Sequence, residues 1–238
     1  MITLINLSQL FLAVLKWTFK INSMLRKIFL LLVCISSVYN LNAQFESSKQ
    51  VYVGSGLSEL VSSAKTVAIL PFKAKISYKR MPKGTTVESI KEEEKALTTT
   101  MQQGMLTFLL RKSDDYTVKF QDVDRTNALL KKAGVYEDID AVLADSLCKI
   151  LGVDAIIKST WTYEKTGSEA GAIIMALAVG VNKNVGSGGL TMQIYGVKDG
   201  ELAWRFYKEM NEQAWSNASE MMERIMRKIG RNFPFVKK

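Results

Sequence analysis

The residues with the most potential for chemistry are six carboxylates that precede or lie in two predicted helices. They are Asp122, Asp124, Glu137, Asp138, Asp140 and Asp145. Paired carboxylates can hydrolyse glycosidic bonds, and converging carboxylate oxygens can bind calcium. However, Asp122 and Asp140 stand where helices are expected to begin, and acids there cap the helix. The pattern therefore favours a structural role, with a carboxylate-dependent hydrolase as an alternative.

Other reaction types lack the residues that they need. The chain contains no histidine and only two cysteines, Cys34 and Cys148. Nucleophiles activated by histidine and zinc sites built on histidine or cysteine clusters are therefore excluded. Cys148 lies on the apolar stripe of a predicted helix, so we expect a buried core thiol. The sequence predicts no catalytic, cofactor-binding or metal-binding residues, and the protein is expected not to be an enzyme.

A short glycine motif, Gly54-Ser55-Gly56, precedes the apolar residues Leu57 and Leu60. Glycines can cradle a phosphate when they lie between a buried strand and the start of a helix. The third glycine of the dinucleotide-binding motif is absent here. We therefore interpret residues 44–65 as a lead-in segment that ends in a short helix.

Apolar periodicity predicts the elements that must position these residues. Strands are expected at 66–72, 116–121, 153–163, 190–197 and 202–207, and helices at 87–109, 123–133, 140–151 and 215–229. The first strand is apolar on both faces and is expected to be central, whereas 73–86 is a loop or an edge extension. Asp199-Gly200 predicts a hairpin turn. The fold class is thus α/β, a two-layer or three-layer-like sandwich with a mixed sheet of about five strands in the order β-α-β-α-α-β-β-β-α.

The amino-terminal region carries a secretion signal that starts at Met24 rather than Met1. A short basic start, the apolar run 28–38 and a small-residue ending at Ala43 are what signal peptidase requires. We interpret 1–23 as an upstream mis-start, 24–43 as a signal peptide and 66–238 as one domain. Cleavage removes four cationic residues and no acid, so the net charge falls from +9 to +5. This charge does not favour nucleic acid as a partner, and the expected location is the periplasm.

Three motifs carry a resemblance to a group of bacterial envelope domains. They are Val67-Ala-Ile-Leu-Pro-Phe72, Leu151-Gly-Val-Asp-Ala-Ile-Ile157 and Asp199-Gly-Glu-Leu-Ala-Trp-Arg205. The chain resembles the amino-terminal domain of the Tol–Pal translocation protein, the lipoprotein activators of penicillin-binding proteins and the periplasmic domain of the curli secretion channel, and most of all small uncharacterised secreted members. The resemblance implies a fold that binds or assembles, with Trp204 as a packing residue and no catalytic residue.

The chain departs from this group in an insertion at 166–189. Its run 170–181 carries no charge and is too short to cross a bilayer as a helix. We expect it to be buried or to face a partner, with membrane contact as the alternative. The candidate contact residues are Ile173, Ile174, Met175, Leu177, Val179 and Val181.

The sequence leaves three functions open. The favoured one is a non-catalytic periplasmic binding or assembly domain of a Gram-negative cell envelope, with an unknown envelope protein or a second copy as partner. The alternatives are a subunit of an oligomeric outer-membrane export channel and the carboxylate-dependent hydrolase. Lipidation of Cys34 is a minority hypothesis, because Val33 before it is not a small residue.

Overall fold

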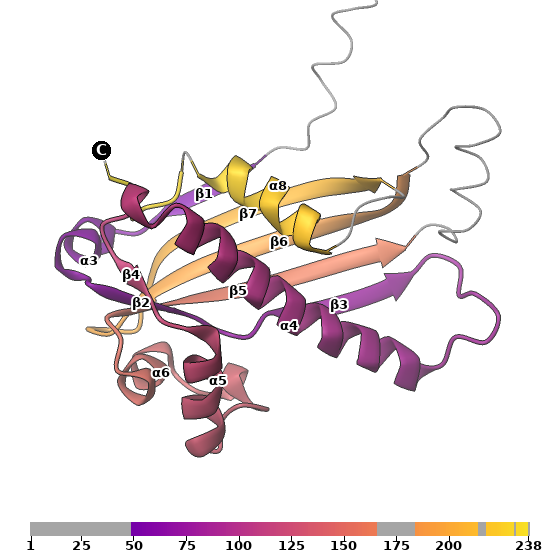
Figure 1. Ribbon diagram of the computed structural model, residues 1–238, viewed down its shortest axis with the longest axis horizontal. Coiled ribbons are helices and arrows are strands. Elements are labelled where there is room, and N and C mark those ends of the chain that lie inside the picture. The colour runs from indigo at the N-terminus through magenta and orange to yellow at the C-terminus, as the bar shows by residue number, and fades with distance from the viewer. Residues whose placement is uncertain (1–48, 166–183, 214–217, 231, 238) are drawn as a thin grey trace, which may run out of the picture. The chain divides into compact units, whose positions relative to one another are not determined.

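Seven strands form one mixed sheet within the residues that the computed structural model describes, which are 49–165, 184–213, 218–230 and 232–237. The elements follow one another as β1 (Gln50–Val53), α3 (Leu57–Ser63), β2 (Thr66–Ile69), β3 (Lys73–Tyr78), α4 (Val87–Arg111), β4 (Lys119–Phe120), α5 (Val123–Lys132), α6 (Ala144–Leu151), β5 (Ala155–Lys165), β6 (Asn184–Gly196), β7 (Leu202–Gln213) and α8 (Ala218–Ile229) (Figure 1). The α/β class and the mixed sheet expected from the sequence are confirmed.

The strand order across the sheet is β1-β7-β6-β5-β2-β4, and β3 pairs with β5. β1, β7, β6 and β5 are antiparallel neighbours, whereas β2, β3 and β4 form the parallel pairs. Both β2 and β3 run along one side of β5, β2 beside its beginning and β3 beside its end. β5 is therefore the central strand. The strand expected at 66–72 lies inside the sheet, between β5 and β4, and is buried on both faces as expected, but it ends at Ile69 and is not the middle strand.

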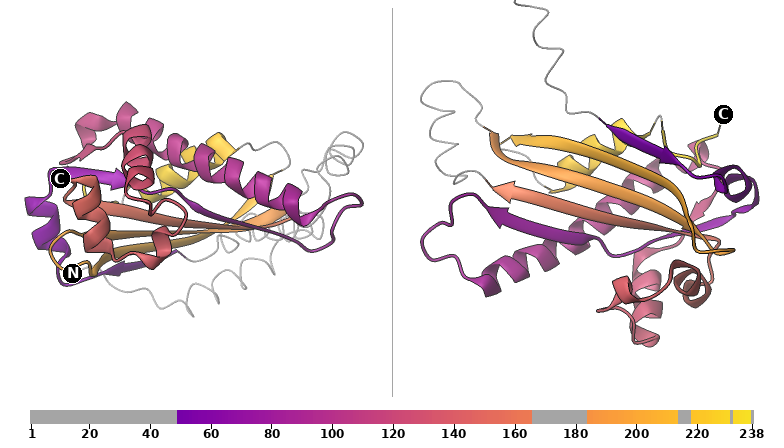
Figure 2. Two further views of the ribbon diagram at one scale, coloured as in Figure 1. Left: turned by 90° about the horizontal axis from the view of Figure 1, so that it is seen from below. Right: turned by 180° about the vertical axis from the view of Figure 1, so that it is seen from behind.

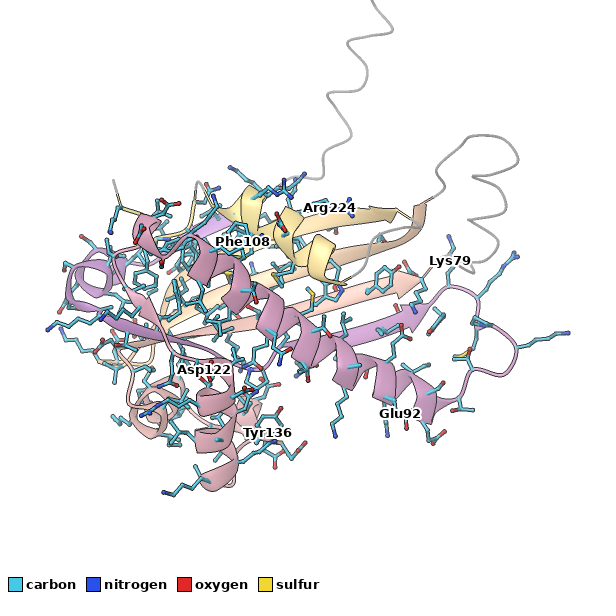
Figure 3. All side chains as sticks on the ribbon, viewed as in Figure 1. Lys79, Glu92, Phe108, Asp122, Tyr136 and Arg224 are labelled. Carbon is cyan, nitrogen blue, oxygen red and sulfur yellow. The ribbon has the colours of Figure 1, made fainter. Side chains whose placement is uncertain are left out.

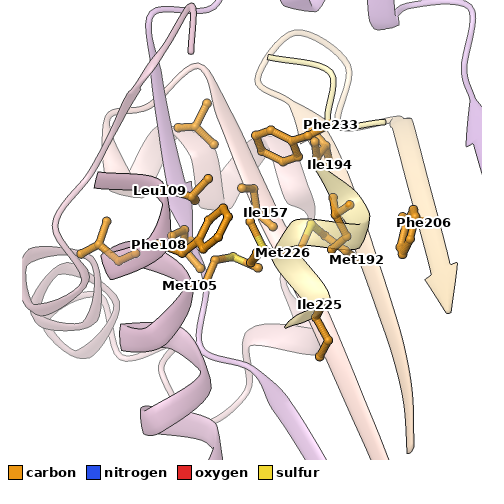
Figure 4. Packing of buried hydrophobic residues seen from close by; sticks show 14 of the residues in the cluster. Met105, Phe108, Leu109, Ile157, Met192, Ile194, Phe206, Ile225, Met226 and Phe233 are labelled. Carbon is orange, nitrogen blue, oxygen red and sulfur yellow. The ribbon is translucent and has the colours of Figure 1, made fainter. Parts of the chain in front are cut away.

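One face of the sheet packs against α4 and α8 (Figures 1 and 4). Alternate residues of the strands point into this layer, among them Ile157, Ile194 and Phe206, which are fully buried. Met105 and Met226 reach them from the two helices. Burying side chains of this size stabilises the fold by about 1.5–3 kcal/mol each. This layer is the main core.

The opposite face is covered by α5 and α6 only at the end formed by β2 and the beginning of β5. Ala68 and Ile156 of the strands pack there against Leu130 and Cys148 of the helices. The expected cap is confirmed at α5, where the Asp122 carboxylate accepts hydrogen bonds from the backbone N–H groups of Asp124 and Arg125. The fold thus has three layers at this end and two elsewhere among the described residues.

Three predictions of local structure were inaccurate. The helix expected from Asp140 begins at Ala144, and Asp140 lies in a single 3-10 turn before it. The strand expected at 116–121 is reduced to β4. The two strands beyond the expected five are β1 and β3, which lie at edges and gain their hydrogen bonds from β7 and β5. The alternation of β3 (Lys-Ala-Lys-Ile-Ser-Tyr) was a signal that the sequence analysis did not use, and its position agrees with the edge extension expected at 73–86, whereas β1 has only four residues.

Candidate functional site

A broad polar surface lies on the sheet face opposite α4 and α8, beyond the end covered by α5 and α6. Leu190, Met192 and Ile194 of β6 are buried under the helices, so Thr191 and Gln193 point to this other face. The same alternation holds in the neighbouring strands. We call the surface the polar sheet face and define it as Lys73, Lys75, Lys158, Thr160, Thr162, Thr191, Gln193, Arg205, Tyr207 and Glu209. The rear view shows no helix of the described residues over it (Figure 2).

The strand register arranges these side chains in rows that cross three or four strands. One row comprises Lys73, Thr160, Thr191 and Tyr207. The next comprises Lys158, Gln193 and Arg205. Neighbouring strands lie about 4.8 Å apart, so each row offers hydrogen-bonding groups at regular spacing. The face therefore suits an extended polar partner better than a small enclosed substrate.

Tyr207 is the aromatic centre of the polar sheet face. Its hydroxyl donates a hydrogen bond to the Glu209 carboxylate at 2.8 Å, and the Arg205 guanidinium lies 6.0 Å from its ring centroid. The hydrogen bond to Glu209, together with partial burial, raises the pKa of the Tyr207 phenol. The phenol thus stays protonated at neutral pH and acts as a donor, not as a base.

Thr162 and Tyr207 pack closely against Gly189 on the polar sheet face. A Cβ on Gly189 would lie 3.2 Å from Thr162 Oγ1 and 3.3 Å from Tyr207 Cε2. Thr162 and Tyr207 also line a depression of about 740 Å³ that reaches Lys75 and Glu209. Gly188 faces the other way, where a Cβ would meet the Trp161 ring at 2.4 Å. The pair therefore allows neighbouring side chains to pack closely on both faces of the sheet.

Asp140 holds the border between the polar sheet face and the α5–α6 layer. Its carboxylate pairs with Lys73 and lies 2.6 Å from Lys158 Nζ. Hydrogen bonds from these two lysines lower the pKa of the Asp140 carboxyl. The sequence predicted a helix cap here, but the structure shows an ionic anchor between the 3-10 turn and two strands.

The other acidic residues do not converge on a site. Asp122 caps α5, and Asp145 forms an ion pair with Lys149 on the same helix at 2.8 Å. Asp124 is exposed in the first turn of α5, and Glu137 and Asp138 are exposed in the turn that follows this helix. In the part of the chain that the structure describes, no three acidic, cysteine or histidine residues gather as metal ligands would. The arrangement does not provide the paired carboxylates of a hydrolase.

Two further sequence motifs have structural roles. Cys148 is fully buried, and burial raises the pKa of its thiol to about 12, so the prediction of a core thiol is confirmed. Gly54 packs so closely on β7 that a Cβ would lie 2.6 Å from the Leu202 carbonyl oxygen. Gly56 precedes α3, which confirms the expected short helix. The close packing of Gly54 on β7 thus holds the connection between β1 and α3 against the sheet.

The predicted contact residues of the insertion fall outside the described residues. They are Ile173, Ile174, Met175, Leu177, Val179 and Val181. Sequence reasoning also missed the polar sheet face, although the signal was present. Thr191, Gln193, Arg205 and Tyr207 alternate with apolar residues in the predicted hairpin, and alternation alone indicates one polar face.

Comparisons with known proteins give structural neighbours but no family. No family model matches the chain, and no curated protein matches it. Similar solved structures include the lipoprotein GNA1162 from Neisseria meningitidis, which is 13% identical over 71% of this chain and 96% of that one, with a TM-score of 0.44. A PelC dodecamer from Paraburkholderia phytofirmans is 11% identical over 80% and 99% of the two chains (TM-score 0.42).

The LpoB C-terminal domain from Salmonella enterica is a third neighbour, 12% identical over 66% of this chain and 93% of that one (TM-score 0.33). Likeness at this level carries no information about activity. No helix in the described residues has the length and apolar character needed to cross a membrane.

Proposed function

We propose that this protein is a non-catalytic binding domain of the bacterial cell envelope, secreted into the periplasm, which holds an envelope protein on the polar sheet face. The supporting observation is the face itself, where four strands present ordered rows of Lys, Thr, Gln, Arg and Tyr with no described helix above them. Antiparallel sheets commonly expose one solvated face. Here that face also contains a hollow beside an aromatic ring and a guanidinium, groups that are enriched at protein interfaces.

The described residues favour binding over a hydrolase. A hydrolase would need two convergent carboxylates, whereas Asp122, Asp140 and Asp145 each have a separate structural partner. An export channel would need a membrane-inserting element, and its sequence candidate at 170–181 lies outside the described residues.

The experiment is site-specific photo-crosslinking in living cells. A photoreactive amino acid at Thr191, in the middle of the polar sheet face, is expected to give one discrete adduct with an envelope protein. The same group at Lys91, exposed on α4, is the matched control and is expected to give none. Thr162→Arg would fill the hollow beside Gly189 and is expected to abolish the Thr191 adduct. Equal labelling at Thr191 and Lys91, or a cytoplasmic location of the protein, would contradict the proposal.

A further inference from the structure

The strand β1 ends the sheet with an unusually apolar edge. Val51, Tyr52 and Val53 are 39%, 52% and 61% exposed, although all three lie in a regular strand. Within the described residues, β1 pairs only with β7. Natural sheet edges are normally protected by charged residues, proline or a bulge. The four residues of β1 contain none of these, and the charged neighbour is Lys49, outside the strand.

The backbone of β1 also points hydrogen-bonding groups outward. The Gly54 N–H donates to the Ala203 carbonyl at 2.8 Å. In an antiparallel pair, residues that bond to the neighbour alternate with residues that do not. The β1–β7 register therefore directs Gln50 and Tyr52 toward β7, and the N–H and C=O groups of Val51 and Val53 away from it. Outward groups on an exposed strand form a template for one more strand.

We infer that β1 pairs antiparallel with β1 of a second copy of this chain, so that the two sheets become continuous across a two-fold axis. The inference does not depend on the proposed function, because it uses the edge of the sheet and not its polar face. In this pairing Val51 lies opposite Val53 of the second copy, and Tyr52 lies opposite Tyr52 on the axis. The outward groups of Val51 and Val53 then bond to one another in two symmetric sets.

The chemistry of the edge favours a second copy over a foreign strand. The facing side chains are valine against valine and tyrosine against tyrosine, so no like charges meet. The outward N–H groups of Val51 and Val53 bond to the C=O groups of the same two residues in the second copy. The edge is therefore complementary to itself, as a two-fold interface requires. A stable interface buries roughly 800 Å² on each partner, far more than four residues provide. We therefore expect a dimer that forms reversibly with concentration.

The first test is sedimentation velocity on the protein purified after expression of the full-length gene, over about a hundredfold range of concentration. The wild type is expected to shift from monomer to dimer. Val51→Pro and Val53→Pro each remove an outward N–H but no bond to β7, so they are expected to abolish the dimer. Val51→Thr keeps the N–H and is expected to retain it. Circular dichroism and thermal unfolding check that each variant is folded.

A second set of variants, which change charge and not backbone, tests the same pairing in case the proline substitutions unfold β1. The double variant Val51→Lys with Val53→Lys places lysine opposite lysine and is expected to be monomeric. Val51→Glu with Val53→Lys places glutamate opposite lysine and is expected to restore the dimer, with an affinity that falls as salt rises. A monomer at every concentration overturns the proposal. So does a dimer that responds to neither set of variants, because it must use another surface.

Discussion

The two outer strands β1 and β3 terminate the same sheet with opposite chemistry. On β3 the Ile76 N–H, which faces away from β5, donates to the Glu94 carboxylate of α4 at 2.8 Å. Lys73 and Lys75 are exposed along the strand, and the exposed Lys79 follows directly after its end (Figure 3). On β1, by contrast, the exposed residues are two valines and a tyrosine, and no residue of the strand is charged.

This difference shows two ways to end a sheet. Charged groups protect the edge of β3. The Glu94 carboxylate already accepts the hydrogen bond of the Ile76 N–H group, and the lysines of the strand disfavour pairing with another strand. Among the described strands, only β7 holds β1. Its residues Trp204, opposite Val53, and Phe206, opposite Val51, are buried, whereas no described strand pairs with the other edge of β1. The contribution of the β3 end to stability should therefore depend on charge and pH, whereas that of the β1 end should depend on apolar packing.

The largest effect is expected at the β1 end. Trp204 is 1% exposed, stacks on Phe206 with ring centroids 6.0 Å apart and meets Phe233 edge-on. Trp204→Ala is expected to lower the free energy of unfolding by about 3–5 kcal/mol. Tyr78→Ala, the corresponding aromatic deletion on β3, is expected to cost only about 1–2 kcal/mol, since Tyr78 is half-buried and hydrogen-bonded to Glu93. Urea denaturation measures both, and equal losses would contradict the contrast.

An intermediate effect is expected from opening the β3 edge. Glu94→Ala removes the acceptor of the Ile76 N–H and is expected to cost about 1–2 kcal/mol, because the bond is charge-assisted and partly buried. Hydrogen exchange at the Ile76 amide should accelerate. Glu92→Ala, two residues away and exposed, is the control and is expected to stay within about 0.5 kcal/mol of the wild type. Unchanged exchange in Glu94→Ala would show that this carboxylate does not protect the edge.

The smallest effect is the pH dependence of the Asp140 anchor. Its lysine partners lower its pKa in the folded state, so its contribution is present above the ordinary aspartate pKa of about 4 and is lost as the pH falls through the lower folded value. Asp140→Asn is expected to cost under about 1 kcal/mol at neutral pH, because the pair is half-exposed, and this cost is expected to shrink as the pH falls below about 4. Asp138→Asn should behave as the wild type. A loss for Asp140→Asn that stays constant with pH would mean that the ion pairs contribute nothing.

The elements that the sequence predicted well are those whose signals are local. The Asp122 cap, the Gly200 turn and the left-handed Gly152 at the end of α6 each depend on a few adjacent residues. The long strands β5, β6 and β7 were recognisable because one face of each is buried along most of its length. The predicted role of Trp204 in packing is confirmed by its burial.

The features that the sequence did not reveal depend on partners far along the chain. Gln50–Val53 becomes a strand because β7 supplies its bonds, and Lys73–Tyr78 because β5 does. Asp140 resembled a helix cap until the fold brought Lys73 and Lys158 to it. Lys73–Tyr78 does alternate polar and apolar residues, but alternation does not identify β5 as its partner.

The sequence by itself determined the α/β class, the order of the main elements and the two-faced character of the long strands, because burial imposes a period on each of them. Only the tertiary structure decided which strands end the sheet, which face stays uncovered and which carboxylate holds two lysines. These outcomes are set by contacts between residues tens of positions apart, and an isolated segment carries no record of the partner that completes it.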